Sequence, residues 1–290
     1  MSIEIKPFTD TFGAQVDGVD LTQPLDDEAF EAVENALAQY SLLSFRRQFV
    51  DDEQQLAFSS RFGRVHHSVM DASRRRLKDG RFGDVSNIGK DGNLLSEDSD
   101  RRKFGDANML WHTDLSFMRA PARVTVLSAR QLPPVPPDTE YADMRAAWDA
   151  LPAKQRQALE GLQAVHSIFA SRERAGFTEF SETERANAPP ATQPLVRTHR
   201  RSGRKSLYLS AHASHIVGMP LEEGQALLKE LTEFATQPRF VFAYKWQPND
   251  LICWDDSCTM HRAVPFDSKK FVRELRWNAI VEPAPLVDAA

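Results

Sequence analysis

Short apolar runs recur through the second half of this 290-residue chain, and they constrain its fold more than any other feature. The runs are rich in Val, Leu, Phe and Tyr, and turn signals such as Ser202-Gly203 separate them. This pattern predicts β-strands. The strands are expected at 123–132, 195–199, 206–210, 239–246, 251–254 and 272–281. Short strands joined by turns favour an antiparallel sandwich or barrel over an array of β-α-β units.

Helices are predicted by apolar spacing and by capping residues. Phe30, Val33 and Leu37 recur at helical spacing behind an acidic start, and Asp51 with Gln54 forms a capping-box pattern. The helices are expected at 26–40, 51–63, 142–151, 153–162 and 221–235, with a buried strand at 41–45. The fold class is therefore mainly β with flanking helices.

Residues 64–109 form the longest segment without a strong structural pattern. The segment is rich in Asp, Arg, Gly and Ser, with a short apolar island at 85–88. A loop of this length in a compact domain is usually a lid, a binding loop or disordered. We expect one domain over residues 1–290, with a mobile lid at 64–109.

Composition excludes several classes of function. The 36 Lys and Arg residues against 41 Asp and Glu give a net charge of −5, which disfavours nucleic acid as a partner. No run approaches the roughly 18 apolar residues that a membrane span needs, and residues 1–10 do not form a signal peptide. We therefore expect no membrane partner and a cytoplasmic location. The chain also lacks the Gly-rich motifs of nucleotide-binding folds.

One short motif has the residue types of a metal site. His112 and Asp114 are two residues apart, so in an extended segment both side chains point to the same side. His261 follows late in the chain, and Arg273 comes twelve residues after it. Two His and one carboxylate on one face of a metal form the triad of non-haem Fe(II) oxygenases, which leaves positions open for a 2-oxo acid and dioxygen. An Arg can pair bidentately with the far carboxylate of such an acid.

Several longer motifs occur in an order that resembles a known family. They are Phe58-x3-Phe62-Gly63 and residues 110–114, 138–147, 194–199, 211–215 and 273–276. The chain resembles the Fe(II)- and 2-oxoglutarate-dependent dioxygenases of the taurine dioxygenase and 2,4-dichlorophenoxyacetate dioxygenase type, and is most similar to the aryloxyacetate branch. The resemblance implies a double-stranded β-helix (jelly-roll, cupin-like) core with helices outside, and a homo-oligomer.

The resemblance also implies roles for individual residues. It makes His112, Asp114 and His261 the iron ligands. Thr139 would hydrogen-bond the distal carboxylate of 2-oxoglutarate, and Arg273 would form a salt bridge with it. Arg276 is a second candidate for the salt bridge, although strand alternation puts Arg273 and Arg276 on opposite faces.

Substrate contacts are predicted at four further positions. Asn108 matches a position that lines the substrate pocket in taurine dioxygenase, and His212 and His215 lie in motifs shared with the aryloxyacetate enzymes. A hydrogen-bonded histidine beside a core strand explains each of these two about as well. Trp277 stands where the aryloxyacetate and taurine enzymes carry a second arginine for the substrate's acidic group. The substrate's anion is then held elsewhere, or the substrate is less acidic.

The resemblance implies an oxidoreductase with Fe(II), 2-oxoglutarate as co-substrate and O2. It would hydroxylate a small organic acid and release succinate and CO2. Hydroxylation beside an ether oxygen would cleave an aryloxyalkanoate to a phenol and a 2-oxo acid. The same chemistry on a sulfonate or an N-substituted amino acid stays open. A metal-dependent isomerase or hydrolase, which needs no 2-oxoglutarate clamp, and a non-catalytic binding module are the remaining alternatives.

Overall fold

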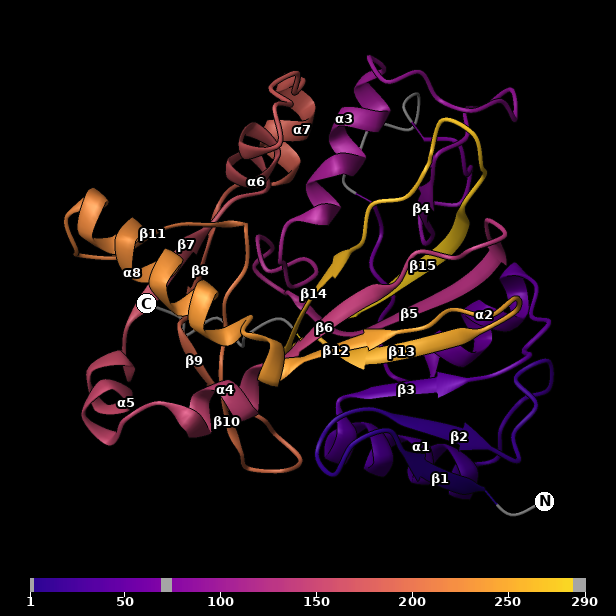
Figure 1. The fold of residues 1–290 in the computed structure, drawn as a ribbon, viewed down its shortest axis with the longest axis horizontal. Coiled ribbons are helices and arrows are strands. Elements are labelled where there is room, and N and C mark those ends of the chain that lie inside the picture. The colour runs from indigo at the N-terminus through magenta and orange to yellow at the C-terminus, as the bar shows by residue number, and fades with distance from the viewer. Residues whose placement is uncertain (1–2, 69–74, 284–290) are drawn as a thin grey trace.

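The computed structural model describes residues 3–68 and 75–283, and its largest element is a seven-stranded sheet (Figure 1). The strand order is β1 (Glu4–Pro7), β2 (Ala14–Asp17), β3 (Leu42–Phe45), β13 (Leu251–Asp255), β5 (Ala122–Gln131), β15 (Glu274–Val281) and β4 (Gly83–Ser86). Neighbouring strands are antiparallel except β2 and β3. The sheet therefore joins the beginning, middle and end of the chain.

A three-stranded antiparallel sheet packs against the large one. It consists of β12 (Val241–Tyr244), β6 (Thr139–Asp143) and β14 (Thr259–Ala263), in that order. One buried cluster contains side chains from both sheets, including Tyr141 of β6, Leu127 of β5 and Trp254 of β13. The space between the two sheets is therefore a packed core.

Two N-terminal helices cover the other face of the large sheet. These are α1 (Asp27–Tyr40) and α2 (Asp52–Ser60), whose Val33 and Phe58 pack with Val126 of β5 in a second buried cluster. Val126 faces these helices while the next residue, Leu127, faces the small sheet. Because successive side chains of a strand point to opposite faces, both faces of β5 are buried.

Smaller elements form the remaining side of the molecule, on the left of Figure 1. A third sheet has the order β11 (Ala213–Ile216), β7 (Gln163–His166) and β8 (Ala191–Pro194), and β9 (Val196–Thr198) pairs with β10 (Lys205–Leu207). The helices of this region are α4 (Met144–Ala150), α5 (Ala153–Leu159), α6 (Ile168–Arg174), α7 (Glu182–Asn187) and α8 (Leu221–Ala235). Leu228 and Leu231 of α8 pack in a cluster with Ala213 and Ile216 of β11.

The segment predicted as a lid contains regular structure. Its β4 pairs with β15 at the edge of the large sheet, and α3 (Asp100–Asp106) continues into a 3-10 turn, η1 (Ala107–Met109). Residues 69–74 lie outside the described residues. Closure of 64–109 over a substrate stays a prediction.

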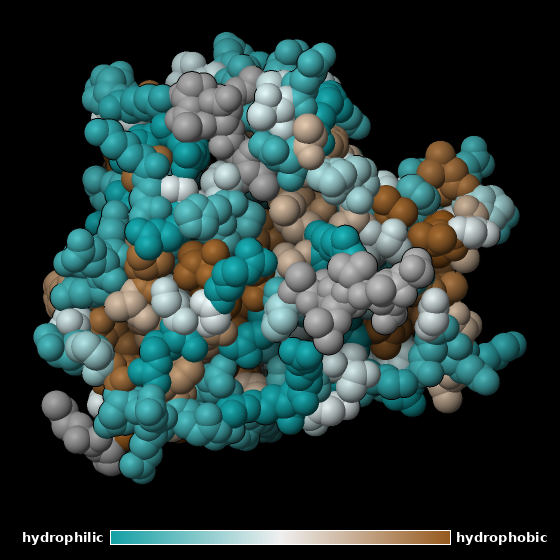
Figure 2. Space-filling model, turned by 180° about the vertical axis from the view of Figure 1, so that it is seen from behind, coloured by the Kyte–Doolittle hydropathy of each residue, from teal (hydrophilic) through white to brown (hydrophobic). Residues whose placement is uncertain are grey.

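Hydrophilic side chains cover much of the molecular face in Figure 2, with hydrophobic ones between them near its middle.

Most of the predicted elements are present, with shifted ends. Helix α8 has the predicted bounds, and the capping box of Asp51 and Gln54 is formed. The helix expected at 142–151 begins only at Met144, because the residues before it form β6. The run 239–246 opens with a 3-10 turn, η2 (Pro238–Phe240), before β12. Within the described residues, no helix is both long and apolar enough to cross a membrane.

Candidate active site

The backbones of His112 and His261 meet in an isolated antiparallel bridge at the start of the site. The His112 N–H donates to the His261 carbonyl at 3.0 Å, and the His261 N–H donates to the His112 carbonyl at 2.8 Å. His261 lies on β14, opposite Tyr141 of β6. Two segments far apart in sequence are thereby held in register.

The side chains of His112, Asp114 and His261 converge on one point. The His112 Nε2 atom lies 3.8 Å from Asp114 Oδ1, and the His261 Nε2 atom lies 3.9 Å from Asp114 Oδ2. One ligand atom from each residue lies within 4.8 Å of the other two. The separations are too long for hydrogen bonds, and they leave room for an ion with ligand bonds of about 2 Å. The donor set fits Fe(II).

The surroundings of these three groups keep them in the protonation states that a metal requires. Burial lowers the pKa of His112 and lowers that of His261 to about 3. Burial alone would raise the pKa of Asp114, but the two imidazoles and the hydrogen bonds from Trp277 and Thr125 hold it below its ordinary value. His112 Nδ1 lies 2.7 Å from the Leu110 carbonyl, so the bond between them places the proton there and leaves Nε2 free. At neutral pH all three are unprotonated ligands.

Asp114 is oriented by groups on the large sheet. The Trp277 indole N–H donates to Asp114 Oδ2 at 2.9 Å, and the Thr125 hydroxyl lies 2.9 Å from the same oxygen. The Asp114 backbone N–H donates to Asp256 Oδ1 at 3.1 Å. Trp277 therefore reaches the site as a partner of a ligand, while its contact with substrate stays a prediction. The sequence analysis did not find Thr125.

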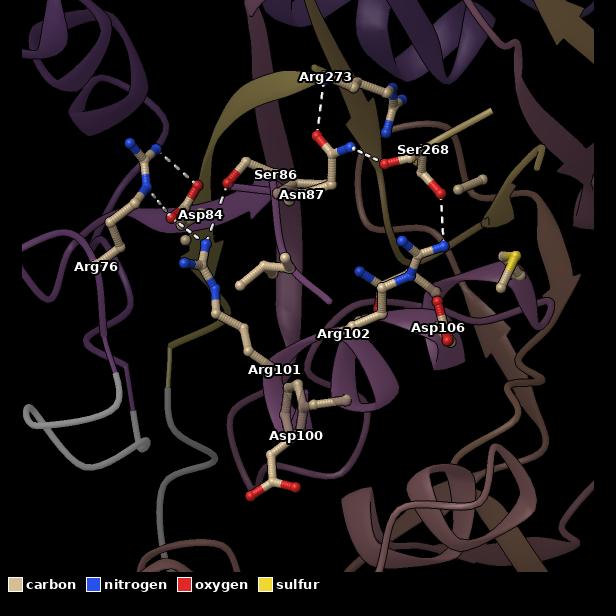
Figure 3. A pocket seen from close by; sticks show the side chains of 18 of the residues that line it. Arg76, Asp84, Ser86, Asn87, Asp100, Arg101, Arg102, Asp106, Ser268 and Arg273 are labelled. Carbon is tan, nitrogen blue, oxygen red and sulfur yellow. Dashed lines mark hydrogen bonds and ion pairs between the residues drawn. The ribbon is translucent and has the colours of Figure 1, made fainter. Parts of the chain in front are cut away.

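Arg273 has the features expected of a clamp for an anion. Its side chain is buried, its Nε has no hydrogen-bond partner, and no carboxylate of the described residues forms a salt bridge with it. Burial lowers the pKa of the guanidinium to about 10, so it stays charged at neutral pH. It lines a cavity of about 540 Å³ (Figure 3). In Figure 3 the Arg273 backbone N–H donates to Asn87, and Asn87 in turn donates to the Ser268 carbonyl.

Thr139 lies beside the same cavity. It pairs in β6 with Ala263 of β14, which lines the cavity together with Arg273. The Thr139 hydroxyl accepts a hydrogen bond from the Trp246 indole at 2.9 Å. That bond orients the hydroxyl oxygen and leaves its proton free to donate to a carboxylate.

Arg276 is not brought to this site. Its guanidinium donates to Glu274 at 2.6 Å and lies 3.4 Å from Asp52. Both partners neutralise its charge on the face of β15 turned away from Trp277. The structure therefore separates the two candidate arginines, and only Arg273 lines the cavity.

Tyr141 is a site residue that the sequence reasoning missed. Its ring stacks on His261 with centroids 5.8 Å apart, and its buried hydroxyl has no hydrogen-bond partner within residues 3–68 and 75–283. It is two residues after Thr139 on the same strand, so both side chains share a face. That spacing was the available signal.

The predicted substrate residues divide into two groups. Asn108 on η1 lines the cavity, and His212 packs with its ring centroid 6.2 Å from that of His112. The His212 Nδ1 atom pairs with the Ser171 hydroxyl at 2.8 Å. His215 instead pairs with Ser214 on β11, and none of its contacts within the described residues reaches the triad. Substrate contact by any of these residues stays a prediction.

The sequence profile of the "Taurine catabolism dioxygenase TauD, TfdA family" matches residues 4–277. The chain belongs to this family. TauD/TfdA membership and the triad together make it an Fe(II)- and 2-oxoglutarate-dependent dioxygenase that uses O2. The metal-dependent isomerase, hydrolase and binding-module alternatives are therefore wrong.

Individual TauD/TfdA relatives are similar over nearly the whole chain. The alpha-ketoglutarate-dependent 2,4-dichlorophenoxyacetate dioxygenase of Burkholderia sp. strain RASC is 43% identical over 92% of this chain and 91% of its own. The enzyme of the same name from Cupriavidus pinatubonensis is 41% identical over 98% of this chain and 99% of its own. The crystal structure of AAD-2 in complex with Mn(II) and N-oxalylglycine is 42% identical, with a TM-score of 0.89 over 98% of this chain and 99% of that one.

Proposed function

We propose that this enzyme cleaves the ether bond of aryloxyalkanoates, giving a phenol and a 2-oxo acid. The observation that carries the proposal is a His-Asp-His triad together with a buried Arg273 that forms no salt bridge with a carboxylate of the described residues, in a chain 43% identical to a 2,4-dichlorophenoxyacetate dioxygenase. The triad supplies the metal site and Arg273 the clamp for the co-substrate. The relative supplies the substrate class.

The two packed sheets fit the family's double-stranded β-helix core, and we propose that they form it. The small sheet carries His261 and Thr139, while the large sheet carries Thr125 and Trp277. Side chains from both sheets thus surround one site, as in a jelly-roll whose ligands bind at the mouth of the barrel.

In the proposed mechanism, Fe(II), 2-oxoglutarate and O2 together convert a substrate C–H bond into C–OH and yield succinate and CO2. Arg273 and Thr139 bind the distal carboxylate of 2-oxoglutarate and fix its orientation. Trp277 and Thr125 hold Asp114 in the geometry of a ligand, as hydrogen-bond partners of metal ligands do.

Cleavage follows from the position of the new hydroxyl group. An aryloxyacetate that is hydroxylated beside the ether oxygen is a hemiacetal. Its C–O bond breaks with the electron pair going to the phenol oxygen, which takes up the hydroxyl proton, and glyoxylate remains. One oxygen atom of O2 ends in succinate and the other in glyoxylate, so the atoms balance.

Anaerobic addition of Fe(II) and then 2-oxoglutarate to the metal-free protein tests the proposal first. A weak visible charge-transfer band should appear, and phenoxyacetate should shift it. Admission of O2 should then release phenol and succinate in equal amounts. If the band appears but no phenol is released, and a sulfonate or an N-substituted amino acid is turned over, the substrate belongs to that class and not to the aryloxyalkanoates. Absence of the band in folded, iron-loaded protein would contradict the clamp.

Three variants separate the roles in the site. His112→Ala should lose iron binding and 2-oxoglutarate decarboxylation. Arg273→Ala should raise the 2-oxoglutarate requirement by about 100-fold or more, because an anion without its buried partner costs on the order of 3 to 5 kcal/mol. Arg276→Ala is the matched control and should leave this requirement unchanged. A raised 2-oxoglutarate requirement in Arg276→Ala and an unchanged one in Arg273→Ala would show that Arg276 binds the distal carboxylate.

Small-molecule substrates fit the cavity, while two other properties stay predictions. A cytoplasmic location fits the two cysteines, Cys253 and Cys258, which are free and buried. A homo-oligomer is expected from the family resemblance, and the elution volume of the purified protein tests it.

A further inference from the structure

Arg172 on α6 is a second buried arginine near the metal triad, and none of the reactions described above uses it. Its side chain is 8% exposed, and no carboxylate of the described residues forms a salt bridge with it. Its Nη2 atom makes a long hydrogen bond of 3.4 Å to Asn108 Oδ1, and its Nε atom has no hydrogen-bond partner in the described part of the chain. The Phe104 ring lies 4.3 Å below the guanidinium carbon.

An unpaired buried charge is costly, so its presence needs a reason. Arg145 shows how this chain treats a structural buried arginine. The Arg145 guanidinium donates to the carbonyls of Ala38 and Gln39 at 2.9 and 3.0 Å. Arg172 has no comparable pair of acceptors among the described residues, although burial lowers its pKa only to about 10 and leaves it charged at neutral pH.

The Arg172 guanidinium lies close enough to the triad to influence it. The positive charge of Arg172 contributes to the lowered pKa of His112, and the negative charge of Asp114 acts back on Arg172. Ser171, the neighbouring residue, bonds to His212, whose ring packs against His112. Arg172 approaches the triad from α6, whereas Arg273 precedes β15. The two guanidinium groups therefore come from different elements.

We propose that Arg172 binds the carboxylate of the primary substrate while Arg273 binds that of 2-oxoglutarate. The assignment rests on the proposed function, and it names the residue that makes the enzyme prefer a substrate with a carboxylate over a neutral one. Trp277 cannot supply this contact, because its N–H is committed to Asp114. Asn108, which touches both Arg172 and the cavity, would give up its long bond when the carboxylate enters.

The surroundings of Arg172 also favour an aromatic acid. Phe104 packs edge-on against Phe177 with centroids 5.5 Å apart, and both rings line the cavity. In an aryloxyacetate the carbon to be hydroxylated is bonded directly to the carboxylate carbon. An anion anchor for this reaction must therefore lie close to the metal site, and Arg172 follows Ser171, whose partner His212 packs against the ligand His112.

Binding of phenoxyacetate and of its neutral amide, measured by calorimetry without O2 in the presence of Fe(II) and 2-oxoglutarate, tests the assignment. The wild type should prefer the acid. Arg172→Met should weaken phenoxyacetate binding by about 100-fold and change amide and 2-oxoglutarate binding by less than about threefold. Arg172→Lys, which keeps the charge without the planar fork, should lose about tenfold. Arg185→Gln, an exposed arginine on α7, is the control and should keep the preference.

A structural role for Arg172 gives a different result. If it only held the fold, Arg172→Met would lower the melting temperature of the ligand-free protein and weaken acid and amide equally. The proposal expects a melting temperature that is not lower, because a buried charge without a carboxylate partner is removed. Unchanged phenoxyacetate binding in Arg172→Met, or an equal loss in Arg185→Gln, overturns the assignment. A wild type that binds 2-oxoglutarate but neither acid nor amide overturns the proposed function, and this assignment with it.

Discussion

Two of the three triad ligands are oriented by hydrogen bonds to other residues, whereas Nδ1 of His261 has no hydrogen-bond partner among the described residues. The Leu110 carbonyl orients His112, and Trp277 with Thr125 orients Asp114. These bonds are formed within the protein alone. The side chains of His112 and Asp114 are therefore oriented before an ion arrives, which reduces the entropy lost on binding.

Replacing Trp277 by Phe tests this orientation. The variant keeps most of the ring but loses the bond to Asp114, so affinity for Fe(II) or Mn(II) should fall by about 10- to 100-fold. A metal titration of the ligand-free protein measures it. Trp246→Phe is the matched control, since it removes an indole bond to Thr139 instead and should leave metal affinity unchanged. Equal affinities in both variants and the wild type would contradict the role of Trp277.

Site residues that lie in recognisable sequence motifs could be predicted. Residues that reach the site only through tertiary packing could not. His112, Asp114 and His261 stand in motifs, and their side chains converge in the structure, while Arg273, also in a motif, lines the cavity. Arg172 stands in no motif, and an isolated arginine in a helix is usually a solvated charge. Only the packing of α6 against η1 shows that it is buried.

The motif at the start of helix α4 stabilises the packing of two helices and takes no part in the chemistry of the site. Asp143 caps the helix by accepting the N–H groups of Arg145 and Ala146. The Arg145 side chain then donates to carbonyls of Ala38 and Gln39 in the last turn of α1. Those carbonyls have no partner inside their own helix. The motif 138–147, which supported the family resemblance, thus joins α4 to α1.

Arg145→Met should destabilise the protein without changing the site. Two buried carbonyls lose their donors, so the free energy of unfolding should fall by about 3 kcal/mol. Urea denaturation at fixed pH measures this change. The surface pair of Arg204 and Asp149 provides the control, and Arg204→Met should cost less than about 1 kcal/mol. Similar losses in the two variants would show that α1 does not depend on Arg145.

Element prediction succeeded where the periodic pattern was long. Helix α8 is long enough for its apolar spacing to define both ends. Strand β14 is short and follows a turn, and its conformation depends on pairing with β6. Its residues alone do not distinguish it from the loop around it, so the strand that carries His261 was not predicted.

The molecule as a whole buries neutral histidines, and this makes its stability dependent on pH. Burial lowers the pKa of His166 to about 3 and that of His66 to about 4. Their unfolded forms take up a proton near pH 6.5, while the folded forms remain neutral until far lower pH. Between these values the unfolded state binds more protons, so stability falls as the pH decreases from about 6.5.

Unfolding by urea at pH 7.5 and at pH 5.5 should show this loss. The loss of stability caused by His166 is about 1 kcal/mol at pH 5.5 and nearly zero at pH 7.5. His166→Gln should therefore reduce the difference between the two pH values by about that amount. An unchanged difference in a folded variant would show that His166 is not the source.

The position of β15 also affects the protein during its synthesis. This late strand lies between β5 and β4, inside the large sheet rather than at its edge. A nascent chain that contains β5 but not yet β15 therefore leaves one edge of β5 without a partner. Open strand edges pair readily with other chains. The large sheet is therefore complete only once residues 274–281 are available, and until then β5 presents an edge that can pair with another chain.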